Sequence, residues 1–386
     1  MKSLPILLSR RVALAIAVAP LVSLAAPAAL PPYPVLQGPK INPGRNVNTV
    51  LHFDNGNMLL AGQMFDSKAG TTWGWLAKTD GAGKLLWDKE LGKKAQNAYF
   101  MSAAAGDNGA ILVGVANESA GSSARPSGWI VAMANEGRIL WDRALDFGHG
   151  TSARFIERTV DGTFLVVGKA GVSGVRGKTW VARVDADGHV APEYSLAVPD
   201  MFDLGAFTTT ADGGFLVTGN YFIGPGKGSD GWIGRFNADG KPQWSRKLGI
   251  EELTAVVKEA ADGSIVVAAN AYRDEPVQLV RLSKAGEILQ APVKTGLCGL
   301  PTLWRTRNGQ LRMAGLACPG KYGIASTIGL IADLAHLERI NKIDAIPGGT
   351  VLLLAPLPGR DAIVAQGLGP RQADRFNNVI ATLPVP

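Results

Sequence analysis

A short glycine-containing turn returns along the chain at an almost constant interval. It reads "FDNGNMLLAG" around Gly56 and "ADGGFLVTG" around Gly213, and further copies turn at Gly109, Gly162, Gly263, Gly309 and Gly359. Successive turn glycines are 53, 53, 51, 50, 46 and 50 residues apart. An apolar segment follows each turn, as expected for a β-hairpin whose tight turn favours glycine. The chain is therefore predicted to consist of seven repeats.

A second hairpin follows the first within a repeat. It is clearest in "SDGWIGRFNADGKPQW" (Ser229–Trp244) and recurs in Thr71–Trp87, Pro126–Trp141 and, more weakly, Lys178–Tyr194. Each repeat thus holds four antiparallel strands, a to d. A period of this length with four strands per period predicts an all-β protein, a seven-bladed β-propeller of four-stranded antiparallel blades.

Apolar residues at fixed places in the repeat support this alignment. The position six residues before the turn glycine is apolar in every repeat: Val50, Ala103, Ile156, Phe207, Val257, Leu303 and Leu353. Strand c carries a recurrent tryptophan, at Trp75, Trp129, Trp180 and Trp232. With one such ring per blade, we expect packing between blades rather than a ligand-stacking ladder.

The last repeat ends too early for a fourth strand. After "RFNNVIATL" the chain stops at "PVP", while Tyr33–Ile41 is unused at the other end. Because an open sheet edge exposes unpaired backbone groups, we expect Tyr33–Ile41 to supply the missing outer strand and close the ring.

The first residues have the composition of a targeting segment. Lys2, Arg10 and Arg11 precede the apolar run Val12–Ala26, and small residues follow. This predicts a signal peptide over residues 1–28, a single propeller domain over 29–386, and a periplasmic or secreted location. The apolar run is short and Pro20 interrupts it, so no stable membrane insertion is expected. The choice between general secretion and twin-arginine export stays open.

The charge of the chain is mildly basic. Its 39 basic and 32 acidic residues become 36 and 32 without Lys2, Arg10 and Arg11, a net charge of +4. That charge, with no basic cluster interleaved with aromatic residues, argues against nucleic acid as a partner. A monomer is expected.

The repeat resembles that of a known group of proteins. "DGGFLVTGNY" and "DGWIGRFNADGKPQW" resemble the repeat of exported bacterial β-propeller proteins in the WD40/quinoprotein-like superfamily, most of them without an assigned function. "GKLLW" and "GKPQW" are similar to fragments of the quinoprotein-type repeat, although its fuller docking pattern is missing. The resemblance implies the fold and no particular activity.

No motif of metal or cofactor chemistry stands out. The histidines His52, His149, His189 and His336 are spread over different blades and both faces, and the Asp-Gly segments are typical of hairpin turns rather than calcium loops. Neither a phosphate loop nor a G-x-S-x-G elbow is present, so no metal and no cofactor are expected.

Charged residues are predicted on some of the innermost strands. These candidates for lining the central channel are Glu157, Arg158, Lys258, Glu259 and Arg305. A hydrated channel tolerates charge, which favours a structural interpretation. The alternative is a hydrolase or lyase acting on envelope polysaccharide, with Glu157, Arg158, Glu259 or His149 in the central funnel.

The longest predicted loops join strands b and c and share a face with the d–a loops. The ligand-binding candidates on this long-loop face are Tyr221, Phe222, Arg125, Arg176, Lys227 and His149. Loops on a rigid scaffold commonly carry binding sites. The sequence therefore favours an exported binding or scaffold protein that recognises an envelope protein or glycan, with some preference for an acidic partner. It does not identify that ligand or exclude catalysis.

The chain has two cysteines, Cys298 and Cys318. Export would take them to an oxidising compartment, and the alignment places both on the long-loop face. We predict a disulfide between them, with two packed thiols as the alternative.

Overall fold

The computed structural model describes residues 45–384 except for short gaps. These are 54, 82–83, 93–96, 118–125, 148–149, 172–176, 192–193, 200–201, 225–227, 251–253, 271–274, 300, 307, 319–325, 347–349, 357–361 and 369–377. The predicted signal peptide and the proposed closing strand Tyr33–Ile41 lie outside the described residues.

The described strands form seven antiparallel sheets, six with four strands and one with three. Sheet 1 contains β1 (Arg45–His52), β2 (Met58–Asp66), β3 (Thr71–Thr79) and β4 (Leu85–Leu91). Sheet 2 contains β5 (Ala98–Gly106), β6 (Gly109–Asn117), β7 (Pro126–Ala134) and β8 (Ile139–Leu145). Sheet 3 contains β9 (Thr151–Arg158), β10 (Phe164–Ala170), β11 (Lys178–Val184) and β12 (Tyr194–Ser195). Sheets 4 and 5 are β13 (Phe202–Thr209), β14 (Phe215–Gly224), β15 (Gly228–Phe236), β16 (Pro242–Lys247); and β17 (Thr254–Glu259), β18 (Ile265–Asn270), β19 (Pro276–Leu282), β20 (Ile288–Cys298). Sheets 6 and 7 are β21 (Thr302–Arg305), β22 (Leu311–Leu316), β23 (Thr327–Ile331), β24 (Ile340–Asp344); and β25 (Thr350–Pro356), β26 (Ala362–Leu368), β27 (Asn378–Pro384).

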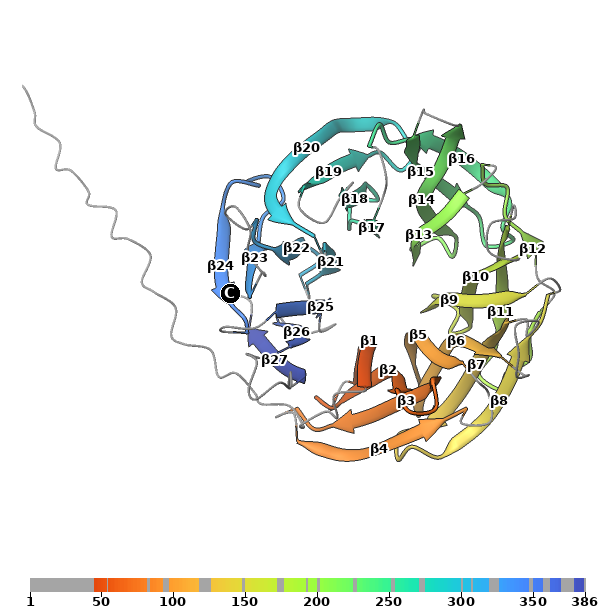
Figure 1. Cartoon of the computed structure of the whole chain (residues 1–386). Helices are drawn as coiled ribbons and strands as arrows, with labels where there is room; N and C mark the ends of the chain where they lie inside the picture. The colour runs from red at the N-terminus through yellow and green to blue at the C-terminus, as the bar shows by residue number, and fades with distance from the viewer. Residues whose placement is uncertain are drawn as a thin grey trace, which may run out of the picture. The chain divides into compact units, whose positions relative to one another are not determined.

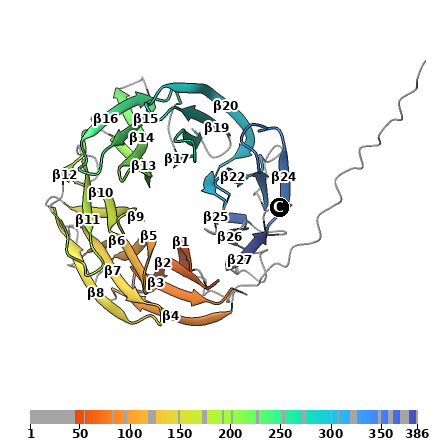
Figure 2. The ribbon, with the colours of Figure 1, turned by 180° about the vertical axis from the view of Figure 1, so that it is seen from behind.

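The sheets are the blades of a β-propeller, numbered here in chain order. The first strands of successive blades contact one another from β1 through β5, β9, β13, β17 and β21 to β25, and β25 contacts β1. Figures 1 and 2 show these strands innermost and the fourth strands at the periphery. The predicted all-β propeller fold and the order of strands in blades 1 to 6 are confirmed. Among the described residues no helix is long and apolar enough to span a membrane.

The apolar core lies between blades. One buried cluster joins blades 2 and 3 through Val113, Ile156 and Val166, and another joins blades 4 and 5 through Leu216 and Val257. All seven apolar residues predicted six positions before the turn glycines lie on first strands. Because one blade alone leaves both faces exposed, stacking on its neighbours provides the core.

The strand c tryptophans are buried in these interfaces. Trp75, Trp129, Trp180 and Trp232 are each less than 7% exposed. Trp180 pairs with Gly168 on the neighbouring strand, where a Cβ would come within 2.4 Å of the ring. The glycine on strand b therefore makes room for the tryptophan on strand c, and the prediction of a packing role is confirmed.

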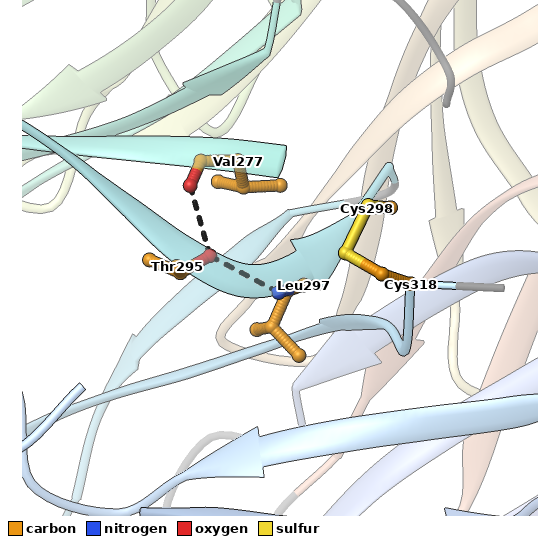
Figure 3. The surroundings of a disulfide bond; sticks show 5 residues. All are labelled: Val277, Thr295, Leu297, Cys298 and Cys318. Atoms are coloured by element: carbon orange, nitrogen blue, oxygen red, sulfur yellow. Dashed lines mark hydrogen bonds between the residues drawn. A yellow bond between two sulfur atoms is a disulfide. The ribbon is translucent and has the colours of Figure 1, made fainter. Parts of the chain in front are cut away.

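The predicted disulfide is also confirmed. Cys298 ends β20 in blade 5, Cys318 follows β22 in blade 6, and their Cα atoms are 4.7 Å apart (Figure 3). The Thr295 hydroxyl donates a hydrogen bond to the Val277 carbonyl and accepts one from the Leu297 N–H, which fixes the end of β20 beside the bridge. The bond is therefore a covalent link between two successive blades.

Candidate functional site

Two of the predicted inner-strand charges meet across three blades. Lys258 Nζ on β17 donates to Glu157 Oε1 on β9 over 2.9 Å and to the Thr208 hydroxyl on β13 over 2.8 Å. The other Glu157 oxygen accepts from the Thr208 hydroxyl and from the backbone N–H of Thr209. The carboxylate is thus held on both oxygens, and the contact ties the innermost strands of blades 3, 4 and 5 together.

Glu259, the neighbour of Lys258, lies in the interface between blades 4 and 5. Its Oε1 accepts from both terminal nitrogens of Arg235 at 3.2 Å, and its Oε2 accepts from the Ala211 N–H at 2.8 Å. Arg235 is 1% exposed and also binds Asp212 of its own blade at 2.7 Å. Burial raises the pKa of Asp212, but hydrogen bonds from Thr210 and Arg235 and the Arg235 charge outweigh it and hold that pKa well below its usual range.

The other two inner-strand candidates also contact neighbouring blades. Arg158 is exposed and pairs with Asp107 of blade 2 at 2.6 Å. Arg305 donates to the backbone carbonyl of Glu259. These contacts give the candidates a role in joining blades, because each side chain already has a partner.

The aromatic pair that was predicted on the long-loop face is among the described residues. Tyr221 and Phe222 lie near the end of β14, where the β14–β15 hairpin extends past Trp232. The Tyr221 hydroxyl donates to Asp230 at 3.4 Å, and Lys247 Nζ lies 5.4 Å from the centre of its ring. Phe222 is 41% exposed and Ile223 is 44% exposed. Arg125, Arg176, Lys227 and His149 lie outside the described residues.

A contact that recurs at four interfaces was not recognised in the sequence. An aromatic ring on strand d packs on the glycine of the next blade's c–d turn in the pairs Trp87–Gly137, Trp141–Gly188, Tyr194–Gly240 and Trp244–Gly286. We call this the ring–turn contact.

Hydrogen bonds reinforce the ring–turn contact. The Trp244 indole donates to the Lys284 carbonyl at 3.0 Å, and Arg246, two residues on, donates to the Gly286 carbonyl at 3.0 Å. Gly286 has φ of 83°, and a Cβ there would lie 2.6 Å from the Trp244 ring. The signal was visible in the sequence as an aromatic residue followed by a cation, as in "WDK", "WDR" and "WSR", combined with a turn glycine one repeat later.

The interface between blades 5 and 6 departs from this pattern and contains a pocket of about 450 Å³. Gln290 in blade 5 occupies the position that Trp244 occupies in blade 4. Trp244 pairs with Arg235 across strands c and d of blade 4, and Gln290 pairs with Arg281 in the same way in blade 5. His336 occupies the position of the turn glycine in the c–d turn of blade 6. Its N–H donates to the Asp333 carbonyl, as the Gly286 N–H donates to the Ser283 carbonyl in blade 5. Both halves of the ring–turn contact are therefore replaced where the pocket lies.

The pocket opens among the a–b and c–d turns, opposite the long loops. Its walls are Ala260, Ala261, Asp262, Val266, Leu279, Arg281, Gln290, Gly309, Gln310, Leu311, Ala332, Asp333, Leu334 and Ala335. The sequence had favoured ligand binding on the long-loop face, and that preference stays a prediction.

One cluster of metal-ligating residue types belongs to a turn. Asp185, Asp187 and His189 each place a ligand atom within 4.8 Å of the others. Asp185 accepts from the N–H groups of Asp187 and His189 and lies 2.9 Å from the His189 ring nitrogen Nδ1. These bonds are those of a hairpin turn, as the sequence indicated.

Comparisons with known proteins show the fold. No protein-family model and no curated protein matches the chain. Among solved structures, a protein of unknown function from Dyadobacter fermentans DSM 18053 matches with a TM-score of 0.51 and 11% identity, over 89% of this chain and 96% of that one. Sqt1 from Chaetomium thermophilum matches with a TM-score of 0.50 and 9% identity, over 89% and 97%. Puromycin hydrolase matches with a TM-score of 0.56 and 17% identity, over 90% and 54%, so the chain spans about half the length of that enzyme.

Proposed function

We propose that the protein is an exported binding protein of the cell envelope that recognises a protein or glycan through its long-loop face. Two features support export: the basic and apolar N-terminal segment, and the disulfide. Disulfides persist in oxidising compartments and are rare in the cytosol.

The exposed end of the β14–β15 hairpin carries the proposal. Phe222 and Ile223 are adjacent and both more than 40% exposed, while Tyr221 beside them is held by Asp230 and Lys247. An ordered aromatic next to exposed apolar side chains is a composition that binding surfaces favour, since aromatic anchors dominate most interfaces. Because the hairpin continues the strands of blade 4, it presents these side chains on a rigid support.

The proposed partner is acidic. This preference rests on Arg125, Arg176 and Lys227, whose place in the long loops comes from the sequence. If those charges contribute, partner affinity falls as salt is raised.

A retention experiment tests the proposal. The purified protein is immobilised, exposed to an envelope extract of its own cells, and the retained protein and glycan are quantified. Changing Phe222 and Ile223 together to Ser is expected to reduce retention at least tenfold. The control is Val160→Ser on the turn face, since Val160 is an apolar residue that is 73% exposed. Equal retention by both variants would exclude this face.

The alternative, a hydrolase or lyase in the central funnel, has less support. The carboxylates of Glu157 and Glu259 are each held on both oxygens by hydrogen-bond donors. A general acid or base needs a carboxylate available to the substrate. The likeness to puromycin hydrolase concerns the fold.

A further inference from the structure

We propose that the pocket between blades 5 and 6 binds an aromatic carboxylate, with its ring on the apolar floor and its carboxylate on Arg281. This site goes beyond the proposed long-loop function and does not depend on it. The pocket volume of about 450 Å³ lies within the range of roughly 300–1,000 Å³ usual for small-molecule sites.

The preceding interface shows what the pocket lacks. Between blades 4 and 5, the space is filled by the Trp244 ring and by the Glu259 carboxylate that crosses to Arg235. One blade later, Gln290 takes the place of Trp244, and Arg305 takes the place of Glu259, four residues before the turn glycine. An aromatic ring and a second carboxylate on the arginine are therefore the two groups that the preceding interface has and this one lacks.

Arg281 is suited to hold the carboxylate. Its described bonds all go to its own blade, to Asp262 at 3.0 Å and to the Ser264 hydroxyl at 3.1 and 3.3 Å. Its side chain is 42% exposed, whereas that of Arg235 is 1% exposed. Because a guanidinium has five donors in a fork that matches carboxylate geometry, Arg281 has capacity for a second carboxylate. Arg235 holds two carboxylates in the same way.

The remaining walls fit a flat ring with polar edges. Val266, Leu279 and Leu311 belong to the buried apolar cluster of this interface and form the floor. Gln290 and Gln310 add amide groups that can donate or accept hydrogen bonds. An apolar pocket with a few convergent polar groups is the usual composition of a small-molecule site.

The two carboxylates in the pocket walls, those of Asp262 and Asp333, already have hydrogen-bond partners. Asp262 accepts from Arg281 at 3.0 Å, as Asp212 accepts from Arg235, and Arg235 holds a further carboxylate, that of Glu259, beside it. Asp333 turns toward its own loop, where it accepts from the Ala335 N–H at 2.9 Å and lies 2.7 Å from the His336 ring nitrogen Nδ1.

Calorimetry with indole-3-acetate on the purified, disulfide-bonded protein tests the proposal. Indole-3-acetate is expected to bind at least tenfold more tightly than indole-3-acetamide, which has the same ring without the charge. Arg281→Met is expected to weaken indole-3-acetate binding at least tenfold. Its matched control is Arg183→Met, because Arg183 occupies the equivalent position in blade 3 and pairs there with Asp161.

A second variant and a peptide pair complete the experiment. Gln290→Trp combined with His336→Gly rebuilds the ring–turn contact, fills the pocket and is expected to abolish binding, which keeps the test decisive if Arg281→Met folds poorly. The peptide Gly-Gly-Trp and its C-terminal amide distinguish a peptide terminus from a free aromatic acid as the source of the ligand. Equal binding of acid and amide, unchanged binding by a folded Arg281→Met variant, or no binding of either acid at millimolar concentration would overturn the proposal.

Discussion

The interfaces on either side of blade 5 are built by different means. Between blades 4 and 5, Trp244 makes the ring–turn contact and Arg235 binds Glu259 across the interface. Between blades 5 and 6 the arginine recurs as Arg281, but Gln290 replaces the tryptophan and Arg305 replaces the glutamate. There the disulfide Cys298–Cys318 joins the blades at the long-loop end, and a pocket opens at the turn end.

The difference shows how a repeat protein can gain a pocket without losing its ring. Each ring–turn contact and each cross-interface ion pair fills space near the turns. Replacing both leaves that space empty, and a covalent bond at the opposite end keeps the two blades adjacent. Because a disulfide stabilises independently of packing at the turns, it allows the turn end to specialise.

The largest expected effect is the loss of Arg235. Arg235→Met leaves Glu259 buried without its charged partner, which costs about 3–5 kcal/mol of unfolding free energy. The equivalent change in blade 5, Arg281→Met, breaks an exposed pair and costs less than about 1 kcal/mol. Urea unfolding of the two variants measures the contrast, and equal losses would contradict the distinction between the interfaces.

The disulfide ranks next. Changing Cys298 and Cys318 together to Ser is expected to lower the unfolding free energy by about 3 kcal/mol, because the bond closes a segment with a sequence separation of 20. Thermal unfolding of the variant and of reduced parent should agree. A variant as stable as the oxidised parent would show that other contacts hold blade 6.

The ring–turn contact itself is expected to contribute less. Trp244→Ala removes a partly buried ring and its bond to the Lys284 carbonyl, and the expected loss is about 2 kcal/mol. Gln290→Ala is the control at the equivalent position and is expected to change stability by less than about 0.5 kcal/mol. A similar loss of unfolding free energy in both variants would contradict the claim that the ring–turn contact stabilises one interface and is absent from the other.

The equivalent positions Gln290 and His336 are expected to be coupled. A Cβ at the turn position comes too close to a packed ring, as the 2.6 Å distance at Gly286 shows. Gln290→Trp alone is therefore expected to destabilise the protein, whereas Gln290→Trp with His336→Gly gains about 1 kcal/mol relative to the sum of the single changes. A double-mutant cycle from urea unfolding measures this coupling, and additive single changes would reject it.

The sequence predicted the repeats well because turns and buried strands have local signatures. The turn glycines, the strand c tryptophans and the cysteine pair all carried enough information to place blades and a disulfide. The pocket was not predicted, because it results from replacements relative to another blade. Gln290, Arg305 and His336 occupy the positions that Trp244, Glu259 and Gly286 occupy at the preceding interface. The partners of Glu259 were equally hidden, because Arg235 is 24 residues away and lies on β15 of the neighbouring blade. Recognising either feature requires aligned repeats and their spatial order together.

The smallest expected effect concerns a turn carboxylate at an interface that retains a ring–turn contact. Hydrogen bonds from Thr159 and Thr163 lower the pKa of Asp161 to about 2, and the nearby Arg183 adds to this. An unfolded aspartate has a pKa of about 3.9, so the folded state binds fewer protons between those values. The stability that Asp161 contributes is therefore present above about pH 4 and is lost as the pH falls toward about 2. Because Asp161 is exposed, the contribution stays below about 1 kcal/mol. Asp161→Asn is expected to be slightly less stable at pH 7 and to lose stability less steeply than the parent between pH 4 and 2. Urea unfolding curves for parent and variant, recorded in parallel across that pH range, measure the difference. If the unfolding free energy of both proteins falls equally steeply with pH, Asp161 does not contribute to the acid sensitivity.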